Sequence, residues 1–533
     1  MPAVSDDTRC ESMLGAPGVL SCGRLPTTPA TGERRFNNSN FMDIGSLGIL
    51  TSPPMKFRTA LLCFLGSFLF LSPAASRAVA ERPNFIVIFC DDLGYNDIGP
   101  FGSKKHRTPN LDRMAREGRK FTDFYVTSGV CSPSRSSLMT GCYPKRVGLH
   151  ENEQGRWVLF PGNQRGLNPK EITIAEIMKG QGYATGCIGK WHLGDQKKFL
   201  PTRQGFDSYF GIPYSNDMGA MNGAGEVVTN RGYPPLPLLR DEEVIETEPD
   251  QRLITQRYTK EVVKWLRAHK DQSFFLYFPQ TMPHAPQFSS ENFAGKSANG
   301  KWGDAVEEID WSVGQVFKTL KELDIDEKTI VVFLSDNGGA TRWGASNHPL
   351  SGAKGSTMEG GQRVPFLIRW PGKAPAGTVC RELTTSMDLL PSFAALAGGS
   401  APQNRVIDGR DVRPLLLGEP GARSPHEAFY YYYRGQLQAV RSGDWKLHLA
   451  RAQRGRGKNA KTTKLPNKLY DLSSDIGEKT NLAKARPDVV NRLLALAAKA
   501  REDLGDDAPE HKTEGRNTRQ PGFVKNAVKL RKD

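Results

Sequence analysis

The feature that most constrains this chain is a short apolar run, rich in β-branched and aromatic residues, that occurs four times and leads each time to a polar cluster. The clearest run, NFIVIFC at residues 84–90, ends in Asp91 and Asp92. A continuous apolar run of this length is too short for an ordinary helix and is typical of a strand buried on both faces of a parallel sheet. The other three runs cover residues 183–188, 274–278 and 329–334, and they lead to GKWH, PHAP and SDNGG.

Helical patterns separate these runs. Apolar residues recur at helical spacing over residues 172–181, 256–269 and 304–323. This alternation predicts an α/β fold in which a large, mixed but mainly parallel sheet is sandwiched by helices. Because ligands of such sheets bind beyond the carboxyl ends of the strands, we expect the four polar clusters to meet at one edge.

Two of the polar clusters offer only oxygen ligands, which are Asp91 and Asp92 after the first run and Asp336 and Asn337 after the last. Oxygen-only sets favour hard cations such as Ca²⁺ or Mg²⁺. Adjacent strand residues point to opposite faces, so the two aspartates can share an ion only if the chain turns there, and Gly94 is expected to permit that turn. Such sequences are also ordinary turn chemistry, but their repetition after two buried-type strands favours a metal site.

The remaining clusters contribute cations and proton carriers. Lys190 and His192 follow the second run, His284 follows the third, and Lys354 lies in the Gly-rich segment 351–361, which lacks the P-loop pattern. Each residue alone is an ordinary loop residue. Together with a metal, they suit the stabilisation of a polyanionic transition state and the protonation of a leaving group.

The segment GVCSPSRSSLMTGC at residues 129–142 places Cys131 just before an expected helix. We predict that helix over residues 134–139, with Pro133 in its first turn and Gly141 at its end. The free N–H groups of a helix N-terminus favour an anion, so Cys131 could simply be a thiol of lowered pKa. The chain has eight cysteines and no CxxC pair, which fits no zinc pattern and leaves room for one disulfide.

A leader is expected at residues 55–80. Lys56 and Arg58 precede an apolar run at 60–71 and a small-x-small site at 78–80, which is the layout of a secretory signal peptide. The run is too short to span a bilayer comfortably. We therefore expect export to the periplasm or the extracellular space, with no stable membrane insertion. Residues 1–54 are expected to be unstructured or to come from a misassigned start.

Composition divides the rest of the chain. We expect a catalytic domain over residues 83–420, a C-terminal subdomain of a smaller antiparallel sheet and a helix over 425–505, and a flexible basic tail over 506–533. The formal charge of +15 is compatible with nucleic acid, a membrane surface or an acidic polymer as partner. No stretch resembles a nucleic-acid-binding module, so nucleic acid is not expected.

The segment from Cys131 to Arg135, followed by LMTG, resembles the signature of the type I sulfatases, relatives of alkaline phosphatase. The similarity covers residues 83–505 and includes LYDL at 469–472 and EKTNL at 478–482. It implies an alkaline-phosphatase-like fold and a sulfuric ester hydrolase. It also implies that a formylglycine-generating enzyme, which reads Cys131, Pro133 and Arg135, oxidises Cys131 to Cα-formylglycine before folding.

The resemblance also implies roles for the clustered residues. The oxygen ligands would bind Ca²⁺, rather than Mg²⁺, beside the formylglycine, and the hydrated aldehyde would attack sulfur with help from Asp336. Lys354 and His284 would neutralise and protonate the leaving alcohol. His192 would take a proton from the second hydroxyl so that sulfate leaves. The remaining implied catalytic residues, which hold the diol and shield charge, are Arg135 and Lys190.

The sequence FGIPYSND at residues 210–217 is similar to the arylsulfatase A and N-acetylgalactosamine-6-sulfatase branch. This similarity implies that Ser215 contacts the substrate, a sulfated sugar or an aryl sulfate. His348 is a further candidate because it lies close to Lys354 in the sequence. Two alternatives remain, a phosphodiesterase or phosphonate hydrolase of the same superfamily and an inactive polysaccharide-binding homologue.

Overall fold

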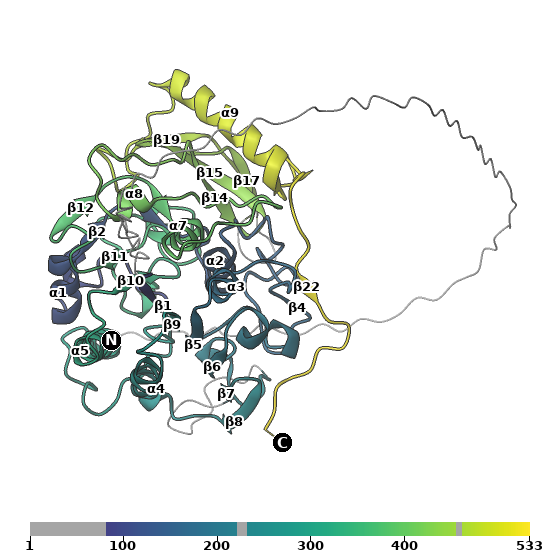
Figure 1. Ribbon diagram of the computed structural model, residues 1–533. Coiled ribbons are helices and arrows are strands. Elements are labelled where there is room, and N and C mark those ends of the chain that lie inside the picture. The colour runs from purple at the N-terminus through teal and green to yellow at the C-terminus, as the bar shows by residue number, and fades with distance from the viewer. Residues whose placement is uncertain (1–81, 221–231, 455–460, 533) are drawn as a thin grey trace, which may run out of the picture. The chain divides into compact units, whose positions relative to one another are not determined.

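The computed structural model describes residues 82–532, apart from 221–231 and 455–460 (Figure 1). The predicted leader and the segment before it lie outside the described residues. A ten-stranded sheet forms the centre of the region predicted to be the catalytic domain. Its strands, in spatial order, are β12 (Thr378–Cys380), β2 (Arg119–Phe121), β11 (Phe366–Arg369), β10 (Thr329–Ser335), β1 (Asn84–Cys90), β9 (Phe274–Pro279), β5 (Ala184–Ile188), β6 (Ser208–Gly211), β7 (Pro237–Arg240) and β8 (Glu243–Thr247).

The five central strands, from β10 to β6, run parallel, and the strands that flank this block, β11 on one side and β7 on the other, pair with it antiparallel. The four apolar runs of the sequence are β1, β5, β9 and β10, which confirms the predicted mixed, mainly parallel sheet. In the register of the sheet Cys90 lies beside Ser335, and Phe89 lies beside Pro279. The polar residues that follow these strands therefore leave the sheet at the same edge.

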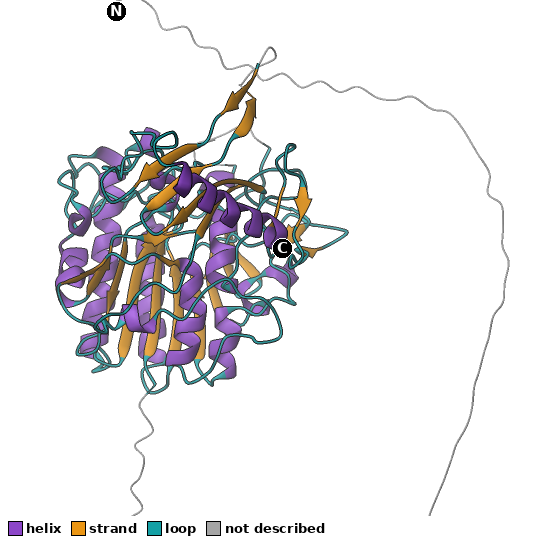
Figure 2. Cartoon of the chain, turned by 90° about the horizontal axis from the view of Figure 1, so that it is seen from above, coloured by secondary structure: helices purple, strands orange, loops and turns teal. Residues whose placement is uncertain are grey.

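Helices cover both faces of the sheet (Figures 1 and 2). Residues of β1 alternate between two apolar cores, with Phe85 and Val87 in one and Ile86 and Ile88 in the other. This alternation is what a strand buried on both faces requires. The first core is completed by α2 (Cys131–Thr140), α3 (Ile174–Gly180) and α7 (Leu389–Leu396), and the second by α1 (Pro109–Glu117), α4 (Ile254–Ala268) and α5 (Gly300–Glu322).

The C-terminal part contains a four-stranded antiparallel sheet, as expected. Its strands are β14 (Phe429–Tyr433), β15 (Gln436–Ser442), β16 (Trp445–His448) and β19 (Lys468–Asp471), and α9 (Pro487–Leu504) lies along it (Figure 1). Leu493 of α9 shares one core with Leu447 of the sheet and with Tyr125 of the catalytic domain. Apolar packing therefore continues from one part into the other.

The segment after Asp506, expected to be a flexible tail, instead lies along the catalytic domain in the described residues. The guanidinium of Arg519 donates to both carboxylate oxygens of Glu171, at 2.7 and 2.9 Å. The strand β22 (Gly522–Phe523) pairs with β4 (Arg165–Gly166). A basic composition suggested mobility, but an acidic partner and a free strand edge, both distant in sequence, hold this segment.

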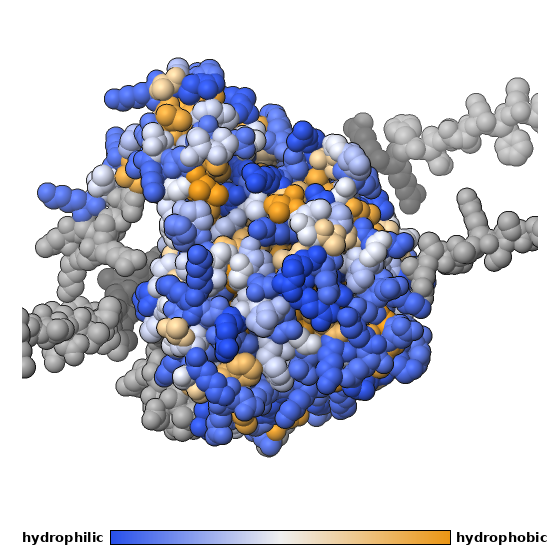
Figure 3. Space-filling model, turned by 90° about the vertical axis from the view of Figure 1, so that its left-hand side faces the viewer, coloured by the Kyte–Doolittle hydropathy of each residue, from blue (hydrophilic) through white to orange (hydrophobic). Residues whose placement is uncertain are grey.

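Hydrophilic side chains cover most of the face shown in Figure 3, and apolar side chains are scattered over it in small groups. Scattered apolar residues of this kind are normal on a protein surface. Within the described part of the chain, no helix has both the length and the apolar character needed to cross a membrane.

Candidate active site

The oxygen-bearing residues that follow β1 and β10 lie together at the carboxyl edge of the sheet. Asp336 Oδ1 accepts the backbone N–H of Asp92 at 3.1 Å, and Asn337 Nδ2 donates to Asp92 Oδ1 at 2.8 Å. Asp91, Asp92, Asp336 and Asn337 are all buried. The pairing of two strands that are distant in sequence thus brings two loops into one cluster.

Asp92 itself makes the turn that places both aspartates in the cluster. Its φ of 67° lies in the left-handed region, which residues with a Cβ rarely adopt. Gly94 was expected to permit this turn by adopting a positive φ, but the φ of Gly94 is not positive. Gly94 is required for a different reason, because a Cβ there would lie 2.4 Å from the carbonyl oxygen of Ser346. An unusual backbone conformation at a polar residue is typical of functional sites.

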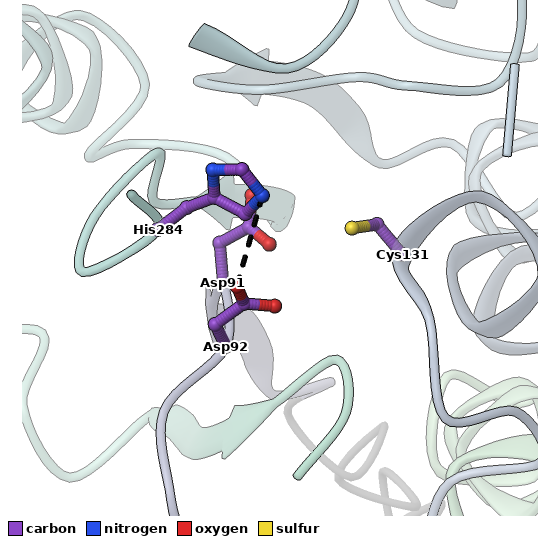
Figure 4. Close-up of side chains that lie close together, drawn as sticks. All are labelled: Asp91, Asp92, Cys131 and His284. Atoms are coloured by element: carbon purple, nitrogen blue, oxygen red, sulfur yellow. Dashed lines mark ion pairs between the residues drawn. The ribbon is translucent and has the colours of Figure 1, made fainter. Parts of the chain in front are cut away.

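The cluster contains unpaired acceptors that suit a cation. Asp91 Oδ1 and Asn337 Oδ1 are buried and have no hydrogen-bond partner among the residues that the structure describes, which is costly unless another group compensates. Asp91, Asp92, Cys131 and His284 offer ligand atoms that all lie within 4.8 Å of one another (Figure 4). Buried oxygen atoms in need of a positive partner fit a hard divalent cation.

Arg135 lies behind the cluster rather than in the open site. It reaches Asp336 Oδ2 through Nε at 3.1 Å and through NH2 at 2.8 Å, and NH2 lies 3.6 Å from Asp91 Oδ2. Its NH1 donates to the carbonyl of Lys190 at 3.0 Å. Arg135 therefore orients two acidic side chains, and its role in holding the diol stays a prediction of the family resemblance.

Two lysines complete the charge balance. Lys190 Nζ forms an ion pair with Asp91 and donates to Ser215 Oγ at 3.1 Å. Lys354 Nζ lies 2.8 Å from the carboxylate of Asp92, and this carboxylate raises the pKa of Lys354 although burial opposes it. Three carboxylates and three cationic side chains cancel formally. A divalent cation would leave an excess of positive charge, which favours an anionic ester.

Cys131 is the first residue of α2, so the helix begins three residues earlier than predicted and ends at Gly141 as predicted. Its sulfur faces the aspartates in Figure 4. Burial, followed by the charge of Asp91, raises the pKa of the Cys131 thiol well above its usual value. The interpretation of Cys131 as a thiol of lowered pKa is therefore wrong, because desolvation outweighs the helix N-terminus.

The five described cysteines are all free. Cys142 is buried in the core, and burial raises the pKa of its thiol to about 12. It does not line the active-site cavity.

The two histidines each keep one ring nitrogen available. His192 Nε2 lies 2.9 Å from the carbonyl of Leu159 and must donate, which leaves the unpartnered Nδ1 as an acceptor. His284 Nδ1 lies 3.1 Å from Asn216 Oδ1. The amide of Asn216 donates through its nitrogen to Gln251, so Nδ1 of His284 is the donor. Nε2, which lies 3.7 Å from Asp92 Oδ2, is the nitrogen that can take up or release a proton.

Comparison with known proteins identifies the family. The family model described as Sulfatase matches residues 83–400, and the model described as the C-terminal region of aryl-sulfatase matches residues 424–525. The chain belongs to the sulfatase family. The arylsulfatase A of Homo sapiens is 39% identical over 463 residues, which cover 80% of this chain and 89% of that protein. The N-acetylgalactosamine-6-sulfatase of Canis lupus familiaris is 38% identical over 386 residues, which cover 69% of this chain and 72% of that protein.

The crystal structure of Ps i-CgsB in complex with k-i-k-neocarrahexaose has a similar fold. Its TM-score is 0.67 at 30% identity, and the match covers 78% of this chain and 92% of that chain. These similarities confirm the predicted family, the predicted fold class and the nearest branch. The protein is a sulfatase and hydrolyses sulfuric esters.

The sulfatase site opens into a cavity of about 600 Å³. Its floor carries charged and catalytic-type residues, namely Asp92, Cys131, His192, His284 and Lys354. Its walls are mainly aromatic and apolar, with Trp157, Val158, Phe160, Met218 and Trp343 among them. Trp157 and Trp343 are 37% and 48% exposed, so aromatic rings remain accessible to a bound substrate.

The cavity includes one of the two predicted substrate contacts. Ser215 lines it and lies between Lys190 and His284, whose Nδ1 is 3.4 Å from Ser215 Oγ. His348 is exposed and does not line the cavity. The neighbouring Asn347 is buried instead, and its side chain forms hydrogen bonds with the backbone of Gly339 and Gly352. The prediction that His348 lines the cavity rested on its closeness to Lys354 in the sequence. It did not hold because Asn347 turns inward and its neighbour His348 faces outward.

Sequence reasoning missed the residues that support or surround the catalytic groups. Asn216 orients His284, and its only signal was its position beside Ser215. Trp157 and Trp343 lie in polar, Gly-containing segments, and an exposed tryptophan in such a loop is the signal that could have suggested a binding surface.

Proposed function

We propose that this sulfatase acts on sulfated carbohydrates and that it uses Ca²⁺ and a Cα-formylglycine formed from Cys131. One observation carries the proposal: a buried, oxygen-rich cluster with unpaired acceptors faces Cys131 at the floor of a cavity with aromatic walls. The floor suits the chemistry of an anionic ester, and the walls suit the apolar face of a sugar ring.

Asp91, Asp92, Asp336 and Asn337 would hold the cation, with the residue at position 131 beside it. Ca²⁺ is favoured because the protein offers several oxygen ligands at one place, whereas Mg²⁺ usually keeps several waters. A bound cation would supply positive charge next to the sulfate oxygens. Arg135 would orient Asp336, since two of its nitrogens donate to the same carboxylate oxygen. Burial and the charge of Asp91 raise the pKa of Asp336 to about 7, and Arg135 opposes this rise.

A hydrated aldehyde at position 131 would supply an oxygen nucleophile and a second hydroxyl group, and loss of the proton of that second hydroxyl would re-form the aldehyde and expel sulfate with the first oxygen. Lys354 would place positive charge beside the scissile bond, because its Nζ reaches the floor of the cavity next to Asp92. His284 would exchange a proton with the leaving oxygen through Nε2, the nitrogen that Asn216 leaves available.

His192 would act as the base that releases sulfate, because its Nδ1 is unpartnered and its ring lines the cavity. The hydrogen bond from Nε2 to Leu159 orients the ring. Burial, followed by the charge of Lys190, lowers the pKa of His192 and so favours the neutral ring. Lys190 would hold Asp91 and Ser215 in place from below.

Two further parts of the proposal concern maturation. Cys131 is only 2% exposed in the folded protein, so a formylglycine-generating enzyme would have to act before folding is complete. The leader-like segment at residues 55–80 would direct the chain to the periplasm or the extracellular space.

The first test is mass spectrometry of the peptide that contains Cys131. We expect this peptide from active protein to be about 18 Da lighter than the cysteine form, and to resist alkylation because the thiol is gone. The peptide that contains Cys380 provides the matched control and should alkylate fully after unfolding. An alkylatable thiol at position 131 in fully active protein would contradict the formylglycine proposal.

The second test concerns the aromatic wall. We expect Trp343→Ala to raise KM for a sulfated oligosaccharide about 10-fold, since an exposed ring that stacks on a substrate contributes roughly 1 kcal/mol or more. KM for 4-nitrophenyl sulfate should change less than about 2-fold, because that ester reaches only the floor. Trp311→Ala, in α5 and outside the cavity, is the control. Steady-state kinetics on defined sulfated oligosaccharides measure both effects, and turnover of phosphate diesters but not of sulfated sugars would contradict the substrate class.

A further inference from the structure

A cluster of buried charged side chains lies where the segment that carries Lys354 meets the C-terminal sheet. Glu359 begins α6 (Glu359–Gln362), Lys446 lies on β16, and Glu478 follows β19. All three are buried, and Lys446 Nζ lies 2.9 Å from the carboxylate of each glutamate. The chemistry proposed above uses none of these groups.

One carboxylate oxygen holds both ends of the Lys354 loop, which we define as residues 351–359. Glu478 Oε2 accepts a hydrogen bond from Ser351 Oγ at 3.1 Å and another from the backbone N–H of Glu359 at 2.7 Å. Between these two ends, Lys354 reaches forward so that its Nζ lies 2.8 Å from Asp92. A side chain of the C-terminal subdomain therefore closes the base of the loop whose tip enters the active site.

The other oxygen of Glu478 is held equally firmly. Glu478 Oε1 accepts from Lys446 Nζ at 2.9 Å and from His448 Nε2 at 2.8 Å. Glu478 also has a φ of 53°, a left-handed conformation that a residue with a Cβ keeps only where its surroundings demand it. One oxygen of the Glu478 carboxylate is thus held by side chains of β16, and the other oxygen is held by the Lys354 loop.

A second contact joins the same two parts and supports this arrangement. Thr357 Oγ1 donates to Gln438 Oε1 of β15 at 3.1 Å. Within the loop, Gly355 packs so closely under the ring of Trp157 that a Cβ there would lie 2.8 Å from the ring. The loop therefore lies between the C-terminal sheet and the cavity wall, and its position depends on both.

We propose that Glu478 is a positioning residue for Lys354, acting through the two hydrogen bonds that its Oε2 accepts from the loop. Lys446 orients Glu478 from the opposite side. This inference rests on the proposed role of Lys354. It also gives the C-terminal subdomain a part in the reaction, because that subdomain supplies the anchor of a loop that enters the active site.

The test begins with Glu478→Gln, which keeps the size of the side chain but removes the charge that faces Lys446. We expect kcat/KM for 4-nitrophenyl sulfate to fall about 10- to 100-fold, since a small displacement of a reacting group has an effect of this size. Asp444→Asn is the matched control. It makes the same chemical change at an exposed residue in the turn between β15 and β16, and it should leave kcat/KM within about 2-fold of the unsubstituted protein.

A double-mutant cycle separates positioning from stability. In the Lys354→Ala background, Glu478→Gln should lower the residual kcat/KM by less than about 2-fold, because the group that it positions is already absent. Its effect on the melting temperature should be the same in both backgrounds. Ser351→Ala removes one of the two loop bonds to Glu478 and leaves the contacts of Glu478 with Lys446 and His448 in place. It should lower kcat/KM about 3-fold or more, while the melting temperature falls by only a few degrees and the protein stays fully folded at the assay temperature.

The outcomes distinguish the two levels of the proposal. If Lys354→Ala alone retains full activity, the proposed role of Lys354 fails. If Lys354→Ala is impaired but Glu478→Gln lowers activity by the same factor in both backgrounds, only the positioning inference fails. If Glu478→Gln does not fold, Ser351→Ala decides: a lowered kcat/KM in a fully folded protein supports the inference, and an unchanged value overturns it.

Discussion

Cys131→Ser is expected to abolish steady-state turnover, with a loss of at least about 10⁴-fold in kcat. A serine hydroxyl offers one oxygen, so it can take up sulfate but has no second hydroxyl from which His192 could remove a proton. We therefore expect a single turnover, after which the protein stays about 80 Da heavier. Intact-mass spectrometry after incubation with 4-nitrophenyl sulfate, together with the size of the product burst, measures this outcome.

Cys142→Ser is the matched control for that experiment. Cys142 lies in the same segment of the chain, is buried, and contacts polar groups such as the carbonyl of Thr140 and the guanidinium of Arg519. A hydroxyl can replace its thiol among these partners, so activity should stay within about 3-fold of the starting protein. Continued multiple turnover by Cys131→Ser, at a rate near that of the unsubstituted protein, would show that position 131 does not supply the nucleophile.

Asp336→Asn is expected to remove both the metal and the activity. The bound metal should fall from about one equivalent per chain to less than about 0.1, and kcat/KM should fall about 10³-fold, because a ligand carboxylate becomes a neutral amide. The change also leaves the buried guanidinium of Arg135 without its main partner, since two of its nitrogens bond to Asp336. Removal of one partner from a buried ion pair costs about 3–5 kcal/mol of unfolding free energy. Elemental analysis, kinetics and urea unfolding measure the three effects.

The control for Asp336→Asn is Asp271→Asn, a change of the same kind at a side chain that is 85% exposed and paired with its neighbour Lys270. Exposed ion pairs contribute little, so metal content, activity and stability should all remain close to those of the starting protein. Full metal content together with full activity in Asp336→Asn would refute the assignment of Asp336 to the metal site.

The sheet was predictable because its strands are buried on both faces and therefore leave an unambiguous pattern. The run NFIVIFC coincides with β1, and the runs that became β5, β9 and β10 were located to within a residue or two at each end. The meeting of Asp91 with Asp336 followed from a general property of parallel sheets, in which the carboxyl ends of neighbouring strands share an edge. Long-range convergence was therefore accessible from local sequence alone.

Features set by single side-chain contacts were not predictable in the same way. Asp92, and not Gly94, adopts the left-handed conformation in the turn after β1. Gly94 is needed for another reason, because a Cβ at that position would collide with the carbonyl oxygen of Ser346. His348 faces outward while Asn347 beside it is buried. The segment after Asp506 is held by a strand edge and an acidic partner that lie hundreds of residues away in the sequence.

The sequence by itself determined the fold class, the family and the chemical types of the groups at the active site, because these depend on patterns and motifs that each lie within a few residues of chain. Only the tertiary structure decided how those groups are arranged. It placed Arg135 behind the carboxylates, left Nδ1 of His192 unpartnered, and set Glu478 beneath the Lys354 loop. The physical reason is that burial and hydrogen bonding join residues that are distant in the sequence, and no local pattern records those contacts.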